Sequence, residues 1–169
     1  MTATLTSPIT FEELVELADE AGVKLEITAG IPTWEAFPGS RHQKAVLRAL
    51  MSVEGSATPD CGCFQIPDVY IKFPDGSLKR PDIAIFREEP PDQDEALELI
   101  PEAVLEVLSK DYEKKDTEIS APFYLEQGVK DVILLDPRTQ GVTHRRRDGN
   151  KQYESPVTIK LECGCQITV

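Results

Sequence analysis

Long apolar runs are missing from this sequence of 169 residues. It contains no stretch of about 18 hydrophobic residues, the length that a membrane-spanning helix needs. Its first 22 residues have neither the basic start nor the apolar segment of a secretory signal. We therefore expect no membrane partner and a cytoplasmic location.

Positive charge is also scarce. Lys and Arg number 18 against 30 Asp and Glu, so the formal net charge is −12. This disfavours binding of a polyanion through a general electrostatic field, because such binding relies on Lys and Arg. The local basic clusters are Lys79-Arg80 and residues 145–147, and we interpret both as solvated hairpin tips.

The rest of the composition is typical of a globular protein, with 40% hydrophobic and 28% charged residues. The length favours one domain over residues 1–169. In chain order, the patterns predict a helix over 8–22, a β hairpin over 23–37, a helix over 40–53, two β-rich runs within 63–86, a strand over 102–109, a helix over 120–128, a strand over 131–137 and a β hairpin in the tail.

Capping and turn residues support several of these elements. Thr10 and Glu13 have the spacing of a capping box, and Ser40 is the expected cap of the second helix. Asp75-Gly76 suits a tight hairpin turn. The runs at 102–109 and 131–137 are continuously apolar, which favours central strands joined by a helical crossover. The sequence therefore predicts an α/β fold.

Two acids interrupt apolar strands: Asp82 in "RPDIAIF" and Glu106 in "AVLEVLS". If the strands are neighbours, the two carboxylates can converge, and convergent carboxylates repel unless a divalent cation joins them. Mg²⁺ binds through one or two carboxylates and can activate water for phosphodiester hydrolysis. A purely structural alternative is that Asp82 satisfies a backbone group and Glu106 pairs with a lysine.

The order of several segments resembles the Uma-type restriction endonuclease family, a branch of the PD-(D/E)XK nuclease superfamily. The resemblance is carried by "LEITAG", "RHQKAVLRAL", "RPDIAIF", "PEAVLEVLS", the spaced Asp, Tyr and Gly-Val that follow, and "DVILLDP". It implies a restriction-endonuclease-like αβββαβ core, with a mixed central sheet flanked by helices and with β hairpins near both ends. It also implies a nuclease that acts on DNA with Mg²⁺ or Mn²⁺.

The resemblance assigns roles to individual residues. Asp82 and Glu106 match the metal-binding acids of the family, and Glu26 matches an early acid that would be a third ligand. His42 leads the helix that would lie near the cleft. The alternatives are that Glu26 is an acid on the surface and that His42 forms only a local hydrogen bond.

The lysine of the superfamily motif is absent. In the wider superfamily the lysine lies two residues after the glutamate, where this chain has Leu108. In this family branch it lies on the following helix, where this chain has Ser120. Lys110 shares the strand face of Glu106 but lies about 13 Å along the strand. Lys114 and Lys115 are six and five residues before Ser120, so an α-helix would place neither on the face of Ser120. We therefore take Lys110 as the substitute candidate.

The cysteines form two Cys-Gly-Cys units, Cys61 with Cys63 and Cys163 with Cys165. If the units meet, their four thiols could bind structural Zn²⁺, although one intervening residue is fewer than such sites usually have. Small buried hydrophobes are the alternative, and stable disulfides are least expected in a reducing cytoplasm.

Three functions remain open from the sequence. The first is a Mg²⁺-dependent DNA nuclease, for which a homodimer would suit cleavage of both strands of a duplex. The second is a catalytically inactive nuclease fold that binds a partner as a module. The third is a zinc-stapled interaction domain.

Overall fold

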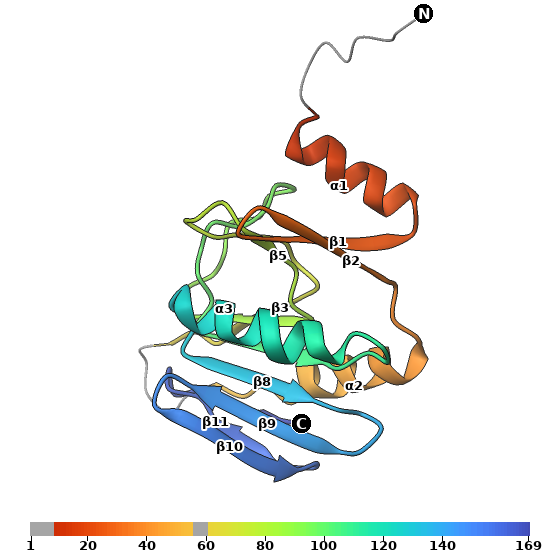
Figure 1. Cartoon of the computed structure of the whole chain (residues 1–169). Coiled ribbons are helices and arrows are strands. Elements are labelled where there is room, and N and C mark those ends of the chain that lie inside the picture. The colour runs from red at the N-terminus through yellow and green to blue at the C-terminus, as the bar shows by residue number, and fades with distance from the viewer. Residues whose placement is uncertain (1–8, 56–60) are drawn as a thin grey trace, which may run out of the picture.

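The computed structural model describes residues 9–55 and 61–169 (Figure 1). In chain order its elements are α1 (Phe11–Glu20), β1 (Val23–Thr28), β2 (Ile31–Ala36), α2 (Ser40–Met51), β3 (Phe64–Pro67), β4 (Ile71–Lys72), β5 (Leu78–Lys79), β6 (Ile83–Phe86), β7 (Ala103–Val107), a π-helical segment η1 (Lys115–Ser120), α3 (Ala121–Glu126), β8 (Asp131–Leu135), β9 (Gly141–Arg146), β10 (Gly149–Glu154), β11 (Thr158–Lys160) and β12 (Gln166–Thr168). No helix in the described part of the chain is long and apolar enough to cross a membrane.

The strands of the described residues form three sheets. The main sheet has the order β10-β9-β8-β7-β6-β3, and a smaller sheet has the order β2-β1-β5-β4. Strands β11 and β12 form a separate hairpin. The expected pairing of the two apolar runs is confirmed, because β7 and β8 are parallel and are joined through η1 and α3. The smaller sheet lies above α3 in Figure 1.

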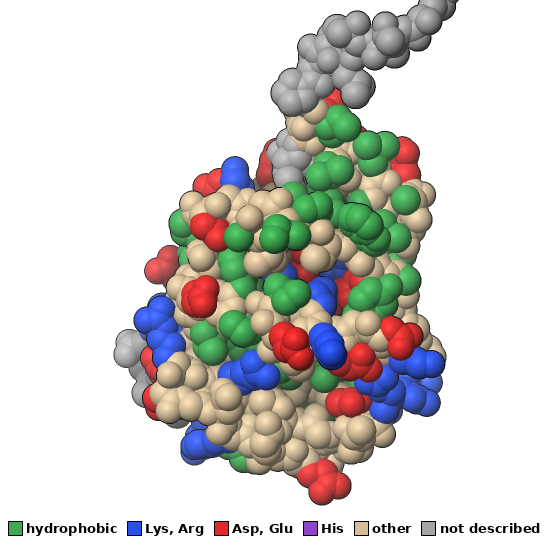
Figure 2. Space-filling model, viewed as in Figure 1, with side chains coloured by type: hydrophobic (Ala, Val, Ile, Leu, Met, Phe, Trp, Pro, Cys, Tyr) green, Lys and Arg blue, Asp and Glu red, His purple; other side chains and the backbone are tan. Residues whose placement is uncertain are grey.

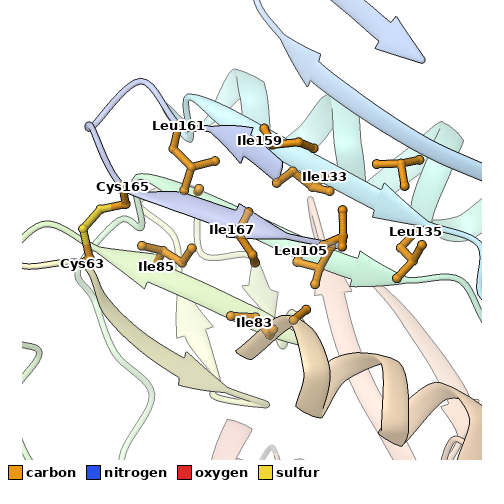
Figure 3. Close-up of a cluster of buried hydrophobic side chains, with 14 of the residues drawn as sticks. Cys63, Ile83, Ile85, Leu105, Ile133, Leu135, Ile159, Leu161, Cys165 and Ile167 are labelled. Carbon is orange, nitrogen blue, oxygen red and sulfur yellow. A yellow bond between two sulfur atoms is a disulfide. The ribbon is translucent and has the colours of Figure 1, made fainter. Parts of the chain in front are cut away.

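The main sheet is covered on both faces because its central strands are apolar on both sides. One face packs against α2 and the β11–β12 hairpin, and Leu105 and Ile133 lie in the same buried cluster as the hairpin residue Ile167 (Figure 3). The opposite face packs against α3, through residues that include Val104 and Tyr124. Side chains that alternate along a strand point to opposite faces, so Glu106 lies on the α3 face.

Local predictions near the N-terminus hold with one correction. The capping box of α1 is formed, since Thr10 and Glu13 each accept a hydrogen bond from the other's backbone amide. The hairpin that follows is also formed, as β1 and β2. Ser40, however, is the first residue of α2, and the cap position is held by Gly39, whose extended backbone suits a cap.

The two β-rich runs within 63–86 each divide into two strands in different sheets. The Asp75-Gly76 hairpin joins β4 to β5 as expected, but β3 and β6 pair with each other in the main sheet. The first run bends after Pro67, where Asp68 has a positive φ of 52°. The second bends before Asp82, after Pro81, which cannot donate a ladder hydrogen bond. These bends bring the smaller sheet next to Asp82.

The crossover helix also differs from the expectation of a start near Ser120. Helical backbone continues from the π-helical segment η1 into α3, and Pro122 lies in the first turn of α3. The helix ends before Gly128, whose φ is 102°. The extra π-helical turn carries Lys115 into the same helix as Ser120, and this changes which lysine reaches the site.

Candidate active site

Asp82 and Glu106 lie opposite each other on neighbouring strands. Strands β6 and β7 are antiparallel with Ile83 facing Leu105, and one step further this register places Asp82 opposite Glu106. Directly opposed residues of an antiparallel pair point to the same face. The amide of Asp82 donates to Glu106 Oε2 at 3.3 Å, and the amide of Val107 donates to Asp82 Oδ2 at 2.8 Å. The two carboxylates that the sequence singled out therefore share one small volume.

The surroundings shift the pKa values of the two carboxylates in opposite directions. Burial raises the pKa of Glu106 well above its usual range, and the charges of Asp116 and Asp82 raise it further. Burial also acts to raise the pKa of Asp82, but the charge of Lys24 and a hydrogen bond from His42 outweigh it, so this pKa is lowered. The ionised form is thus favoured for Asp82 and disfavoured for Glu106, as expected for coupled carboxylates.

Two further side chains hold this pair in place. His42, from the first turn of α2, places Nε2 3.0 Å from Asp82 Oδ2. Tyr124, from α3, donates its hydroxyl to Glu106 Oε1 at 2.8 Å, and burial followed by the charge of Glu106 raises the pKa of this phenol. His42 therefore lies at the site and makes a contact across the fold, whereas a purely local hydrogen bond was the stronger sequence interpretation.

Lys24 was missed by the sequence analysis. It lies on β1 with Nζ 3.7 Å from Asp82 Oδ1 and 3.8 Å from Glu35 Oε1. Burial alone would lower the pKa of Lys24, but the charges of Asp82 and Glu106 and of further nearby acids raise it. The signal that could have revealed it is the spacing of Lys24 and Glu26, which puts both on one face of the strand.

The interpretation of Lys79 as a solvated hairpin tip is wrong. Strand β5 pairs with β1 so that Leu78 faces Ile27, which places Lys79 opposite Glu26. Lys79 is fully buried, with Nζ 2.7 Å from Glu26 Oε2 and 2.9 Å from Ser120 Oγ. The other oxygen of Glu26 accepts the amide of Arg80 at 2.8 Å. A lysine of β5 thus lies beside Ser120, the position at which the resemblance implies a lysine.

The second basic cluster is also bonded to the fold. Arg145 donates to the carbonyl of Thr117 at 2.7 Å, and Arg146 Nε lies 2.5 Å from Asp131 Oδ1. Asp131 is fully buried and also accepts from His144 Nε2 at 2.7 Å and from the amide of Glu162 at 2.8 Å. Asp131 faces Ala103 at the far end of β7 from Glu106, so it is a structural acid outside the site.

Lys115 reaches the site because its helix is a π-helix. A π-helix has i→i+5 hydrogen bonds and a wider turn than an α-helix, so Lys115 and Ser120 lie nearer to one face than α-helical spacing predicts. Lys115 Nζ lies 3.2 Å from Glu26 Oε2, 3.1 Å from Glu35 Oε1 and 3.0 Å from Asp116 Oδ1. Burial acts to lower the pKa of Lys115, but these acids raise it strongly. Lys115 is therefore a permanent cation in the site.

Lys110, the substitute candidate from the sequence, is exposed in the turn after β7. Within residues 61–169 neither Lys110 nor the exposed Lys114 makes an ion pair with a described residue. Leu108 packs in the apolar cluster on the α3 face. Glu26 contacts Lys79 and Lys115, and among the described residues its oxygens form no hydrogen bond with Asp82 or Glu106.

The complete site is a cluster of alternating acids and lysines between the two sheets. In Figure 2, acidic and basic side chains are visible together in a hollow between the β1–β2 hairpin and α3. The cluster combines the site residues that were expected from the sequence with four that were not. These four are Lys24, Glu35, Lys79 and Asp116. Burial raises the pKa of Asp116 to about 6. Asp82 and Glu106 are two buried carboxylates that converge here, and carboxylate oxygens are the ligands that Mg²⁺ prefers. These residues fit a divalent cation.

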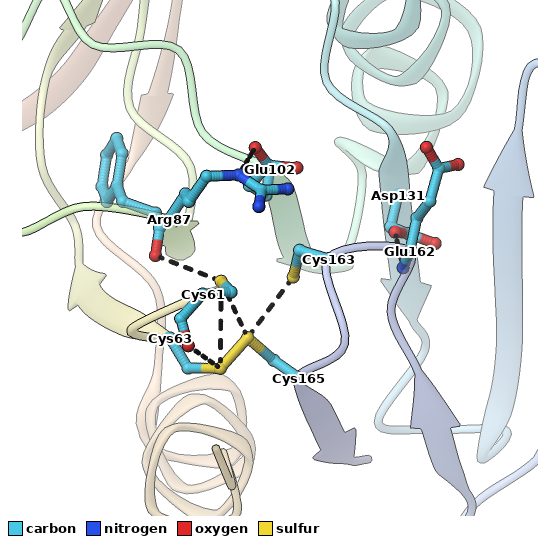
Figure 4. Close-up of a disulfide and its surroundings, with 9 residues drawn as sticks. Cys61, Cys63, Arg87, Glu102, Asp131, Glu162, Cys163 and Cys165 are labelled. Atoms are coloured by element: carbon cyan, nitrogen blue, oxygen red, sulfur yellow. Dashed lines mark hydrogen bonds and ion pairs between the residues drawn. A yellow bond between two sulfur atoms is a disulfide. The ribbon is translucent and has the colours of Figure 1, made fainter. Parts of the chain in front are cut away.

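The four cysteines also meet (Figure 4). Cys63 and Cys165 form a disulfide, which corrects the expectation that disulfides are least favoured here. Cys61 and Cys163 are buried thiols, each with Sγ 3.3 Å from Cys165 Sγ. The sulfur atoms are close enough for a metal ion.

Known proteins resemble this chain in fold and in family. A crystal structure described as a putative nuclease belonging to DUF820 from Anabaena variabilis ATCC 29413 has a TM-score of 0.70 to this chain, with 21% identity, and the match covers 90% of this chain and 88% of that one. This likeness confirms the expected α/β fold. No curated protein matches the chain. The model of the family Uma2, "Putative restriction endonuclease", matches residues 11–163, so the chain belongs to the Uma2 family.

Proposed function

We propose that this protein is a metal-dependent nuclease that hydrolyses phosphodiester bonds of DNA, with Asp82 and Glu106 as the ligands of Mg²⁺ or Mn²⁺. The observation that carries the proposal is that Asp82, directly before β6, lies opposite Glu106 on β7, and each carboxylate accepts a hydrogen bond from the backbone of the other segment. The raised pKa of Glu106 supports it, because burial and the charges of Asp116 and Asp82 disfavour the ionised carboxylate, and a divalent cation would offset this cost.

The surrounding residues orient the two ligands. His42 holds one oxygen of Asp82, and Tyr124 holds one oxygen of Glu106, so each carboxylate has a fixed direction. When bound, Mg²⁺ polarises the phosphate and lowers the pKa of a coordinated water. Lys24, which lies beside Asp82 Oδ1, balances the acidic cluster and reduces its repulsion of a phosphate.

Lys115 supplies the positive charge that the missing motif lysine would provide. Its ammonium is positive at any ordinary pH, so it acts by stabilising negative charge on the phosphate and does not act as a base. Glu26 is a positioning residue in this proposal, because Oε2 contacts both Lys79 and Lys115. We prefer Lys115 to Lys110, since Lys110 is exposed in a turn outside the cluster.

The helix α2 gives the acidic protein a local surface for DNA. Arg41, Lys44 and Arg48 are exposed on α2, and this helix contains no acidic residue. Since His42 in the same helix contacts Asp82, phosphates held by these side chains would lie next to the proposed metal site. The affinity for DNA is then expected to fall steeply with salt.

The test is cleavage of single-stranded and double-stranded DNA and of RNA in Mg²⁺ or Mn²⁺. Asp82→Asn and Glu106→Gln should abolish cleavage, whereas Asp131→Asn, which removes a buried carboxylate of the same sheet, should retain it. Cleavage that survives both site substitutions would refute the assignment of the ligands.

A catalytically silent binding module is the second candidate. The observation that favours it is the closed network of Ser120, Lys79 and Glu26, in which a buried ion pair occupies the position of the motif lysine. Mn²⁺ binding that is lost in Asp82→Asn would count against this candidate. DNA binding without metal binding or cleavage would support it.

We further propose that residues 1–169 act as one domain and that the protein forms a symmetric homodimer, which would place two sites on the two strands of a duplex. Light scattering of the purified chain measures the mass directly. A monomer under the conditions of cleavage would rule out the dimer and leave the site assignment intact.

A further inference from the structure

Two Cys-Gly-Cys segments that are distant in sequence meet at the edge of the main sheet (Figure 4). Cys61 and Cys63 precede the edge strand β3, whereas Cys163 and Cys165 lie in the turn between β11 and β12. The disulfide partners are 102 residues apart, and all four cysteines are buried. The proposed nuclease chemistry uses none of them.

Apart from the bonded pair Cys63–Cys165, the distances between the sulfur atoms are near those of a tetrahedral site. Cys165 Sγ lies 3.3 Å from both Cys61 Sγ and Cys163 Sγ, and Cys61 Sγ lies 4.0 Å from Cys63 Sγ. A Zn–S bond of about 2.3 Å in tetrahedral geometry separates neighbouring sulfurs by roughly 3.8 Å. Small movements of these side chains would thus place all four sulfurs around one ion, once the disulfide is reduced.

The backbone explains how a single intervening residue is sufficient. Gly164 has a φ of 97° and Cys63 a φ of 51°, so both segments are bent instead of extended. A Cβ added at Gly62 would lie 2.1 Å from the ring of Phe64. Glycine is therefore required in both units, and the bends turn the two sulfurs of each unit toward a common point.

A positively charged side chain lies beside the cluster. Zn²⁺ binds cysteine as thiolate, so binding places negative charge on the sulfurs. The guanidinium of Arg87, which is paired with Glu102 at 3.0 Å, also interacts electrostatically with Cys61 and Cys163. It would partly balance the two negative charges of a four-thiolate zinc centre.

We propose that, in the reduced protein, Cys61, Cys63, Cys163 and Cys165 bind one structural Zn²⁺ that clips the β11–β12 hairpin to the edge of the main sheet. The disulfide is the oxidised alternative of the same site. A dithiol reductant gives two electrons and two protons to the Cys63–Cys165 bond and itself becomes a disulfide. Zn²⁺ then displaces the four thiol protons.

The test uses the untagged full chain, purified under anaerobic conditions with dithiothreitol and then freed of it. Elemental analysis should find one zinc per chain, and thiol titration should find four reactive thiols only after unfolding with a chelator. Replacement of zinc by Co²⁺ should give the visible absorption of tetrahedral thiolate coordination. Both Cys61→Ser and Cys163→Ser should lower zinc affinity by at least about tenfold.

A control separates zinc binding from general loosening of the hairpin. The carboxylate of Asp131 accepts a hydrogen bond from the amide of Glu162, the residue next to Cys163. Asp131→Asn changes this carboxylate and no sulfur, so the variant protein should retain zinc. Circular dichroism verifies that each variant is folded. Four titratable thiols in folded, reduced protein that binds no added Zn²⁺ would overturn the proposal. So would bound iron and sulfide, or full zinc affinity in folded Cys61→Ser and Cys163→Ser.

Discussion

Lys79 Nζ lies 2.9 Å from Ser120 Oγ in the interior of the protein. The two residues come from β5 and η1, which pack together only because the smaller sheet lies against the crossover helix. Lys79 also pairs with Glu26 at 2.7 Å, and both side chains are buried. A serine at position 120 is therefore matched by a lysine elsewhere in the fold.

Replacement of Lys79 should destabilise the protein strongly. In Lys79→Met, Glu26 loses its shortest ion pair while it remains buried, which costs about 3 kcal/mol of the free energy of unfolding. Urea denaturation measures the change. The control is Lys72→Met, because Lys72 pairs with Glu98 at 4.0 Å on the surface and should contribute less than about 1 kcal/mol. Equal effects of the two substitutions would show that the buried pair has no special role.

Replacement of Lys115 should reduce catalysis more than binding. If Lys115 stabilises charge on the phosphate in the transition state, Lys115→Met should lower kcat by roughly 10²- to 10³-fold with a small change in KM. Lys110→Met is the matched control and should cleave DNA at the unaltered rate, because Lys110 is exposed outside the cluster. The opposite pattern, with activity lost only in Lys110→Met, would restore Lys110 as the motif lysine.

Metal affinity should increase with pH. Burial and neighbouring acids raise the pKa of Glu106 in the metal-free protein, so Mn²⁺ must displace a proton to bind. Below that pKa, each increase of one pH unit should lower the Kd for Mn²⁺ about tenfold if binding releases one proton. Calorimetry in buffers of different ionisation enthalpy counts this proton. Glu106→Gln should bind weakly and without the pH dependence, and a pH-independent Kd in the unaltered protein would contradict the assignment.

Asp116 should make the protein less stable as pH rises through the weakly acidic range. Its pKa is about 6 in the folded state against 3.8 for the ordinary group, so the folded protein holds this proton more tightly. The stabilisation is complete below about pH 4 and is lost as pH rises through 6, with a ceiling of about 3 kcal/mol.

Asp116→Asn should remove this dependence, as measured by denaturation at pH 4, 5, 6 and 7. The lowered pKa of Glu26 acts in the opposite direction, since its stabilisation is lost as pH falls below the ordinary carboxyl range. An unchanged slope between pH 4 and 6 in Asp116→Asn would assign the effect to another group.

Local sequence was sufficient for most of the elements. The Thr10 capping box, the hairpin turn at Asp75-Gly76 and the β hairpin of the tail follow from short-range patterns, and each is formed. The continuously apolar runs also predicted the crossover pair β7–β8, which is parallel. Such patterns are local because capping, turn geometry and strand alternation involve residues close in the chain. The exceptions are the division of 63–86 between two sheets and the π-helical turn, which depend on packing.

The acids of the candidate site could be found from the sequence, because Asp82 and Glu106 are charged residues in apolar strands and follow a family order. Their partners could not. Lys79 faces Glu26 through the register of β5 on β1, and Lys115 reaches the same carboxylate through π-helical spacing. Neither relation has a signature in the spacing of residues along the chain.

The sequence by itself thus determined the α/β class, most elements and the two central acids. The tertiary structure decided which cations neutralise the cluster, which lysine can serve the chemistry and whether the two Cys-Gly-Cys units meet. The physical reason is that a strand pattern specifies the face on which a side chain lies, while the strand or helix opposite that face is chosen by the packing of the whole chain.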